Sequence, residues 1–540
     1  MRRALPLLAL LSFSCSRPEG ADTERAAVGD VLGGRPRMPV VVVAHEPDHL
    51  APPLARSAAS AAIWPWILPS LVRADADSLG AGRFVGDLAT AWEIEEGGRA
   101  ARFFLGNRMW EDTTQVGSDD VVTTYRLYRD PSIGGDWPAK LTEISSVEAS
   151  ADGIVLFKFR RPLSRERALQ LASLPLIEAE QYRKTKDRRP ALGEPDRPVH
   201  AAGPFRVEEW RPGESIRLAR HPFPPEGRVP RAERILIRFA PGGRSRALQI
   251  EQGIADVAID LPVEEIQRLR EEGSDAVRIV RAGAVAVEAL AFNLDHPTWG
   301  RWDLRHTAML RLDPASLRRA ATDHDAAGMA DPCSGILGFP PDSAASEPGA
   351  DSIGAPFVVL GSPSVEILYD AADPRAERIA VEAVLQFEHL GAAARLRPLA
   401  ARECASRIAG RLFDVAVIEW SIPATGDIGE IWRTGGAANV TGLSDSRTDS
   451  LIASARAPAA DTLSGAWERV DRRARSLAAC LFIDRRARFD GLGPAAAGYR
   501  PAPAHAYGDL LAIEWQPVAG AAGVNRSSAE RSRRRSSGSR

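Results

Sequence analysis

Trp110-Glu111-Asp112-Thr113-Thr114-Gln115-Val116-Gly117-Ser118-Asp119-Asp120-Val121 is the stretch of this sequence that decides the fold. Ser118 belongs to the residue types that accept hydrogen bonds from the free N–H groups at the start of a helix. We therefore expect a helix to begin here with Ser118 as its cap. Less polar residues follow at helical spacing and predict its buried face. These residues are Val121, Val122, Tyr125 and Tyr128.

The length and composition indicate a globular chain with more than one core. With 540 residues, the chain exceeds the roughly 250–300 residues at which a single core stops growing. Its hydrophobic content of 44% and charged content of 26% are ordinary globular values. The formal net charge of −2 gives no global positive field, and the basic stretches lack interleaved aromatic residues. Nucleic acid is therefore not an expected partner.

The C-terminal half has the pattern of an α/β domain. Asp373 followed by Pro374 predicts a helix start, with Asp as the cap and Pro at the first helical position. Apolar residues at helical spacing mark its buried face, namely Ile379, Ala383, Phe387 and Leu390. Strands are expected at residues 365–369, 394–396 and 413–420. In the N-terminal half, the β-branched run at residues 40–44 predicts a buried strand.

The N-terminus has the features of a bacterial targeting segment. Arg2 and Arg3 precede a mostly apolar run at residues 5–13, which is too short to span a bilayer. Ser14 and Cys15 follow and resemble a lipobox, in which the cysteine becomes lipidated. An ordinary signal peptide cleaved nearby is the alternative. No later apolar run reaches the ~18 residues that a membrane helix needs, so a lipid-anchored protein on the periplasmic or extracellular face of the envelope is expected.

The opening stretch resembles, in register, the W-x-D-G-x-P-x-x-A-x-D-V signature of the family 5 extracellular solute-binding proteins. These proteins are the receptors of peptide, nickel and sugar ABC importers. The matching residues are Trp110, Asp112, Asp120 and Val121. The departures are Thr113, Gln115 and Ser118, where the family usually has Gly, Pro and Ala. Further segments that resemble the family follow in its order at residues 84–94, 203–213, 247–257, 292–295 and 439–455.

The resemblance implies an α/β fold with two lobes of the periplasmic-binding-protein type, a ligand cleft between them and an extra subdomain in the N-terminal lobe. The chain is expected to leave the first lobe near Phe292 and to return between Asp484 and Tyr499, which makes a two-crossing hinge. The expected parts are a signal peptide (1–15), a linker (16–39), lobe I (40–72, 200–290 and 485–519), the extra subdomain (73–199), the C-terminal lobe (291–484) and a disordered Ser/Arg-rich tail (520–540).

The implied function is capture of a small solute, peptide-like or other, for delivery to an ABC permease and ATPase complex. The expected protein is a monomer, tethered to the membrane by its lipid. A ligand-sensing lipoprotein without a transport role is the first alternative. No enzyme is expected, because the sequence lacks a G-x-S-x-G motif, a Walker loop and a G-x-G-x-x-G after a strand.

His45-Glu46-Pro47-Asp48-His49 matches the letters of the zinc motif H-E-x-x-H. That motif binds zinc only on a helix, and Pro47 costs a helix interior about 3 kcal/mol. A secreted metal-dependent hydrolase is therefore a remote alternative, and we expect no metal, no cofactor and no catalytic residue. In the resembled family the loop after the first strand lines the cleft, so His45, Glu46 and Pro47 are implied ligand-binding residues. A surface turn without ligand contact is the other interpretation.

Glu419, Trp420 and Ile422 form the second implied wall of the cleft. Peptide-binding members of the family have an Asp three residues after this Trp, and it pairs with the α-amino group of the ligand. This chain has Pro423 there. Without another carboxylate, a closed pocket favours a neutral or anionic ligand, or one whose charge stays in solvent. The candidate replacements are Glu46, Glu419 and Asp427. Trp420 suits either a flat ligand platform or the core.

Overall fold

The computed structural model describes most of the chain between Met38 and Trp515. The described residues are 38–75, 83–135, 137–150, 153–184, 192–272, 277–322, 330–331, 336, 356–421, 426–457, 463–502 and 506–515. The predicted signal peptide with Cys15, the C-terminal tail, Ile422 and Pro423 lie outside these residues. No helix in the described ranges is long and apolar enough to cross a membrane.

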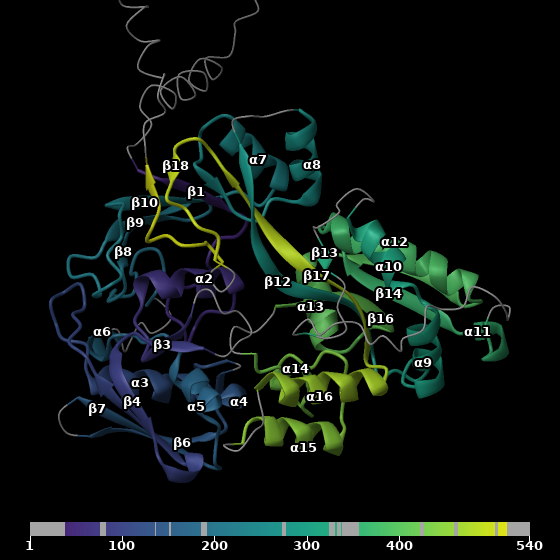
Figure 1. The fold of residues 1–540 in the computed structure, drawn as a ribbon, viewed down its shortest axis with the longest axis horizontal. Coiled ribbons are helices and arrows are strands. Elements are labelled where there is room, and N and C mark those ends of the chain that lie inside the picture. The colour runs from purple at the N-terminus through teal and green to yellow at the C-terminus, as the bar shows by residue number, and fades with distance from the viewer. Residues whose placement is uncertain are drawn as a thin grey trace, which may run out of the picture.

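One large mixed sheet runs through both lobes (Figure 1), in the order β15-β14-β16-β12-β17-β11-β1-β10-β9-β8, with β13 also paired to β17. Its strands are β1 (Val40–Val43), β8 (Phe205–Arg211), β9 (Ser215–Arg220), β10 (Arg234–Phe239), β11 (Val257–Ala258), β12 (Arg278–Phe292), β13 (Ala330–Asp331), β14 (Ser364–Asp370), β15 (Ala393–Leu399), β16 (Val415–Ser421) and β17 (Cys480–Leu492). The predicted strand at residues 40–44 is β1, whose four valines are all buried.

Lobe I is built on β1, which pairs in parallel with β10 and β11. The β8–β9 hairpin extends this part of the sheet beyond β10. The helices and short strands of this lobe are α2 (Ala58–Ile67), α7 (Gly243–Glu251), α8 (Val263–Glu271), β18 (Ala496–Ala497) and β19 (Glu514–Trp515). A two-stranded sheet of β2 (Val72–Ala74) and β3 (Phe84–Gly86) follows at the predicted boundary with the extra subdomain.

The extra subdomain is a second sheet in the order β4-β5-β7-β6, which lies at the lower left of Figure 1. Its elements are β4 (Ala89–Ile94), η1 (Glu96–Gly98), β5 (Ala100–Leu105), α3 (Ser118–Tyr128), α4 (Trp137–Lys140), β6 (Ile144–Ser150), β7 (Ile154–Phe159), α5 (Arg165–Ala172) and α6 (Ala179–Lys184). Its core contains edge-to-face aromatic pairs of Phe157 with Phe103 and with Tyr125.

Buried hydrogen bonds hold the signature stretch in place in this subdomain. Trp110 is fully buried, and its Nε1 donates to Asp120 Oδ2 over 3.1 Å. The same oxygen accepts from the Gly117 N–H, and Asp120 Oδ1 accepts from Ala179 N–H. The helix α3 begins at Ser118 as expected, but Ser118 is not its cap, because Gly117 holds the cap position and Asp120 satisfies its N–H. Of the predicted face, Val121, Tyr125 and Tyr128 are buried and Val122 is half-buried.

Thr113 shows the physical effect of a departure from the family pattern. Its φ of 75° lies in the left-handed region, which costs a residue with a side chain roughly 1–2 kcal/mol. Glycine, which the family usually has here, adopts that region freely. In this chain Asp112 Oδ1 accepts from both the N–H and the Oγ1 of Thr114 and so holds the strained turn.

The C-terminal lobe carries helices on both faces of β15-β14-β16-β12. Its helices are α9 (Trp302–Arg311), α10 (Pro314–Ala321), α11 (Pro356–Val359), α12 (Pro374–His389), α13 (Ala401–Ala409), α14 (Gly429–Trp432), α15 (Ser446–Ala455) and α16 (Leu463–Ser476). The three strands expected from the sequence are β14, β15 and β16. The helix predicted after Asp373 is α12, and the Asp373 side chain caps it by accepting from Arg375 N–H. Ile379, Ala383 and Phe387 face the core as predicted, and Leu390 is half-buried.

Two long antiparallel strands, β12 and β17, join the lobes. Near Arg278 and Leu492, β17 also pairs with β11 of lobe I. From Ala286 to Phe292, β12 also pairs with β16 of the C-terminal lobe. The β12–β17 register shifts between these ends, which bends and twists paired strands. The connection between the lobes is therefore a continuous two-stranded ribbon.

Candidate functional site

A cavity of about 550 Å³ lies in the C-terminal lobe, where β14 and β16 end against α12, α13 and the loop at residues 436–440. We call it the C-lobe groove. Its polar lining includes Glu288, Asp370, Asp373 and Glu419, and its apolar lining includes Ala401, Ala405, Ile408, Trp420 and Val440. This volume is in the range of pockets that hold small organic ligands. The groove therefore brings together two residues of the predicted second wall, Glu419 and Trp420.

Trp420 borders the groove but belongs mainly to the core. It is 6% exposed, and its ring contacts Trp432 and Phe482 with centroid distances of 5.3 and 6.4 Å. This packing is that of a core residue, and the use of Trp420 as a flat ligand platform stays a prediction.

Glu419 takes part in an ion-pair bridge between the lobes. Arg486 of β17 donates to Glu419 Oε2 over 2.5 Å and to Asp260 Oδ1 over 3.0 Å. Asp260 lies between β11 and α8 of lobe I, whereas Glu419 is on β16 of the C-terminal lobe. Burial would lower the pKa of Arg486, but Asp260 and Glu419 raise it well above its ordinary value. Arg486 therefore stays charged and connects the two lobes beside the groove.

Glu288 lines the groove and forms an ion pair with a second arginine. Arg375 donates through Nε to Glu288 Oε1 and through Nη2 to Asp484 Oδ2, both over 2.5 Å. Burial raises the pKa of Glu288 to about 7; Arg375 opposes this shift, and the neighbouring Asp484 adds to it. Glu288 Oε2 and Asp484 Oδ1 are buried without a hydrogen-bond donor among the described residues. A proton on Glu288 therefore reduces the repulsion between the two carboxyl groups.

The predicted first wall is held by structural contacts. Glu46 Oε1 accepts from Trp210 Nε1 and Oε2 accepts from Gly213 N–H, over 2.7 and 2.8 Å. This contact ties the loop after β1 to the β8–β9 hairpin. His45 is exposed and Pro47 is buried. The H-E-x-x-H letters lie in a non-helical loop, where His49 Nδ1 accepts from Ala51 N–H.

Asp427 is also committed elsewhere, in a buried network. Its carboxylate accepts from Arg456 Nε and Nη2 over 2.8 and 2.9 Å and lies 3.3 Å from Arg167 Nη1. Glu143 completes the network, with its Oε2 2.5 Å from Arg167 Nη2. Glu143 and Arg167 belong to the extra subdomain, and Asp427 and Arg456 to the C-terminal lobe. Of the three candidate replacement carboxylates, only Glu419 therefore borders the groove.

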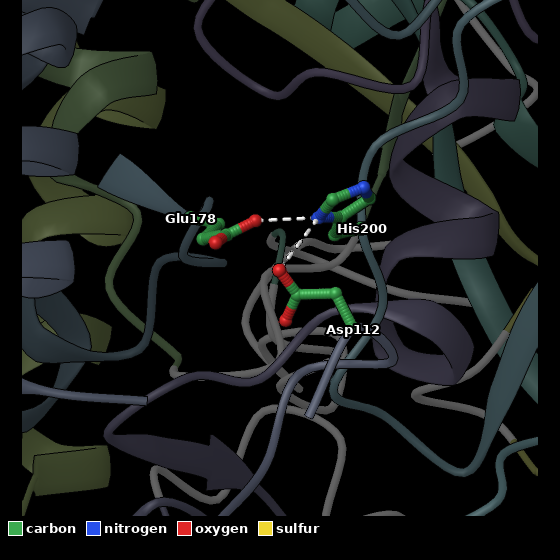
Figure 2. A group of neighbouring side chains, drawn as sticks. All are labelled: Asp112, Glu178 and His200. Atoms are coloured by element: carbon green, nitrogen blue, oxygen red, sulfur yellow. Dashed lines mark hydrogen bonds and ion pairs between the residues drawn. The ribbon is translucent and has the colours of Figure 1, made fainter. Parts of the chain in front are cut away.

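A triad of possible metal ligands lies away from the groove, at Asp112, Glu178 and His200 (Figure 2). His200 Nδ1 is 2.5 Å from Glu178 Oε2 and 4.0 Å from Asp112 Oδ2. The hydrogen bond to Glu178 raises the pKa of His200, while burial lowers it. A protonated His200 therefore balances part of the negative charge of Asp112 and Glu178. The triad also connects the signature stretch and the residue before α6 to the segment before β8.

The sequence reasoning missed the acidic side chains of the groove other than Glu419. Glu288 is the acidic residue inside the apolar run Ala284-Val285-Ala286-Val287-Glu288-Ala289-Leu290-Ala291-Phe292, and such an interruption is a signal for a buried functional or paired charge. Asp370 and Asp373 follow the strand β14 directly. Ligands of open α/β sheets bind beyond the carboxyl ends of strands. Both signals are present in the sequence.

Comparison with known proteins gives a family match over most of the chain. The model of the family described as "Bacterial extracellular solute-binding proteins, family 5 Middle" matches residues 83–439. A probable D,D-dipeptide-binding periplasmic protein, DdpA of Escherichia coli, is 24% identical over 346 residues, which are 62% of this chain and 65% of that protein. The peptide transport periplasmic protein SapA of Salmonella typhimurium is 27% identical over 259 residues, 44% of this chain and 46% of that protein. The chain thus spans about half to two thirds of these relatives.

Solved structures share the whole fold. DppA from Helicobacter pylori in complex with the peptide STSA has a TM-score of 0.75 at 14% identity, covering 89% of this chain and 98% of that one. AgaA from A.tumefacien R10 in complex with agropinic acid has a TM-score of 0.73 at 16% identity, covering 88% and 98%. The two-lobed fold with an extra subdomain in the N-terminal lobe, expected from the signature, is confirmed. The chain belongs to family 5 of the bacterial extracellular solute-binding proteins.

Proposed function

We propose that this protein captures a small solute between its lobes and delivers it to an ABC importer. The observation that carries the proposal is the β12–β17 ribbon, which connects two lobes beside a groove of ligand size. A solute that contacts both lobes binds the closed arrangement more tightly than the open one. It shifts the equilibrium toward closure by that difference in binding free energy. Family membership and the relatives that are named as peptide- or dipeptide-binding support this proposal.

Glu419 and Trp420 are the proposed contacts on the C-terminal side, because both border the groove. Ile422 follows them in the sequence and is retained as a proposed contact. On the lobe I side, His45, Glu46 and Pro47 remain proposed. The Glu46 carboxylate already accepts two hydrogen bonds from the β8–β9 hairpin, so its proposed role is to position the loop.

We expect gently purified protein to release one small solute on denaturation, at close to one molecule per chain. Mass spectrometry of the released fraction identifies it, and added back to stripped protein it should raise the unfolding temperature. At 100 times its Kd, a ligand that binds only the folded state adds about 2.7 kcal/mol to the free energy of unfolding. A stripped protein that no co-purified compound stabilises would contradict solute capture.

We further propose that Cys15 becomes the lipidated N-terminus and anchors the protein at the envelope. Stable anchoring takes more than one membrane signal, so more than one acyl group is expected. Intact-mass measurement should show acyl groups on the wild type and none on Cys15→Ser, which should leave the membrane fraction. A wild type without acyl mass would refute the anchor without bearing on solute binding.

A further inference from the structure

Three neighbouring strands carry carboxylates in one row, and two of these, Glu288 and Glu419, line the C-lobe groove. Glu288 of β12 lies directly opposite Glu419 of β16 on one side and Asp484 of β17 on the other. Side chains at opposed positions of neighbouring strands are close enough to interact, and like charges there repel. The row is therefore favourable only where positive charge reaches it.

Arginines of the protein supply part of that charge. Arg375 binds one oxygen of Glu288 and one of Asp484, and Arg486 binds Glu419 but is shared with Asp260. The second oxygens, Glu288 Oε2 and Asp484 Oδ1, have no donor among the described residues. Glu288 lines the groove but is only 4% exposed, so it acts on a cationic group there mainly through its negative charge.

The rim of the groove adds more negative charge. Asp370 and Asp373 line it, and Arg411, which also lines it, is 2.9 Å from Asp295 and thus already paired. The charged side chains that line the groove among the described residues are four carboxylates (Glu288, Asp370, Asp373 and Glu419) and one arginine (Arg411). Arg375 and Arg486 lie behind the lining and pair with Glu288 and Glu419. Within the described part of the chain, Asp370 and Asp373 have no arginine partner of this kind, so the lining keeps a negative surplus even when Glu288 is protonated.

The size and the remaining lining of the groove decide which cation fits. About 550 Å³ is far more than a bare metal ion fills, and Ala401, Ala405, Ile408 and Val440 offer apolar walls. An ammonium or guanidinium group has several N–H donors and can carry an apolar body. An organic cation therefore matches both the carboxylates and the walls.

We propose that the C-lobe groove selects the cationic group of an organic solute, an ammonium or a guanidinium, through Glu288, Asp373 and Glu419. The inference rests on the proposed solute-binding function and names the charge of the solute that this function captures. These carboxylates come from two strands, β12 and β16, and from the cap of α12. Pro423 therefore does not exclude a cationic ligand, as it would if no other carboxylate bordered the site.

A proton balance follows from this arrangement. Because burial raises the pKa of Glu288 to about 7, Glu288 is protonated for part of the time at neutral pH. A cation that binds beside it favours the ionised form, so the proton moves to the buffer. Binding should therefore release a fraction of one proton per solute at pH 7, and calorimetry in buffers of different ionisation enthalpy measures that fraction.

Matched probe pairs test the charge. We would titrate stripped protein with agmatine and its urea analogue, and with tripeptides in free-amine and N-acetylated form. Cationic members should bind at least tenfold more tightly than their neutral partners, since a charge-assisted hydrogen bond is among the strong ones. Glu288→Gln should weaken the cationic members at least tenfold, change the neutral members less than twofold and abolish proton release.

Asp373→Asn is the second test variant, because Asn caps a helix as well as Asp does and the fold is retained. Its matched control is Asp313→Asn, since Asp313 caps α10 through the same Asp-Pro arrangement away from the groove. Asp373→Asn should weaken the cationic probes at least threefold, and Asp313→Asn should not. Equal affinity for charged and neutral members, or failure of every cationic probe, overturns the inference. A neutral co-purified solute overturns it too, while solute capture stands.

Discussion

Replacing Arg375 with methionine should lower the free energy of unfolding by about 3–5 kcal/mol at pH 8, the usual result of removing one partner of a buried ion pair. Methionine keeps an unbranched apolar stem, so the change isolates the guanidinium. Without it, Glu288 and Asp484 are two carboxylates that are at most 5% exposed and have no cation. Urea denaturation measured at several pH values is the experiment.

The destabilisation caused by Arg375→Met should become smaller as the pH falls. Burial raises the pKa of Glu288 from 4.5 to about 7 in the folded protein, so the protonated form stabilises the fold below pH 4.5 and that contribution is lost as the pH rises through 7. Arg375→Met removes the group that opposes this shift. We therefore expect a loss at pH 5 that is smaller than at pH 8 by about 1–2 kcal/mol.

Arg395→Met is the matched control, because Arg395 pairs with Glu366 at a side-chain exposure of 76%. An exposed pair contributes about 0–1 kcal/mol. Adding Glu288→Gln to Arg375→Met should recover part of the loss, since one buried charge then remains instead of two. Equal losses for Arg375→Met and Arg395→Met, or a loss independent of pH, would show that Arg375 does not hold these carboxylates.

Features of the fold that depend on local pattern could be predicted from the sequence. The strand β1, the helix α12 with its Asp373 cap and the strand β16 follow from β-branched runs, helical spacing and an Asp-Pro start, all of which act over a few residues. Ser118 shows the limit of local reasoning. The cap position falls on Gly117, whose N–H donates to Asp120 Oδ2, and the Asp120 carboxylate is held in place by the buried Trp110 and the distant Ala179.

The groove could not be assembled from the sequence, because strand register decides it. Glu288, Glu419 and Asp484 are between 65 and 196 residues apart, and only the pairing of β16, β12 and β17 makes them neighbours. Contacts between distant segments also explain why Glu46 and Asp427 are not part of the groove. Both were reasonable carboxylates for a ligand, but each has partners from distant segments that occupy its oxygens.

Asp427→Asn should separate the extra subdomain from the C-terminal lobe. Asp427 and Glu143 pair with Arg167 and Arg456 across the two parts, and all four side chains are at most 8% exposed. Ser164 N–H also donates to Arg456 C=O across the same contact, over 2.7 Å. Burial would raise the pKa of Asp427, but Arg456 and Arg167 lower it, so this contact persists at any pH above the ordinary range of an aspartate.

Asparagine keeps the acceptor that Gly429 N–H uses but removes the charge, which leaves two buried arginines with too little negative charge. A loss of about 3–5 kcal/mol is expected, which changes an equilibrium between docked and separated parts more than 100-fold. Small-angle scattering should show a larger particle, and the amide of Ser164 should exchange faster. Asp445→Asn is the matched control, because Asp445 forms a similar two-bond pair with Arg473 inside the C-terminal lobe. If Asp427→Asn lowered the stability but left scattering and Ser164 exchange at wild-type values, the network would support only its own surroundings and not the docking of the two parts.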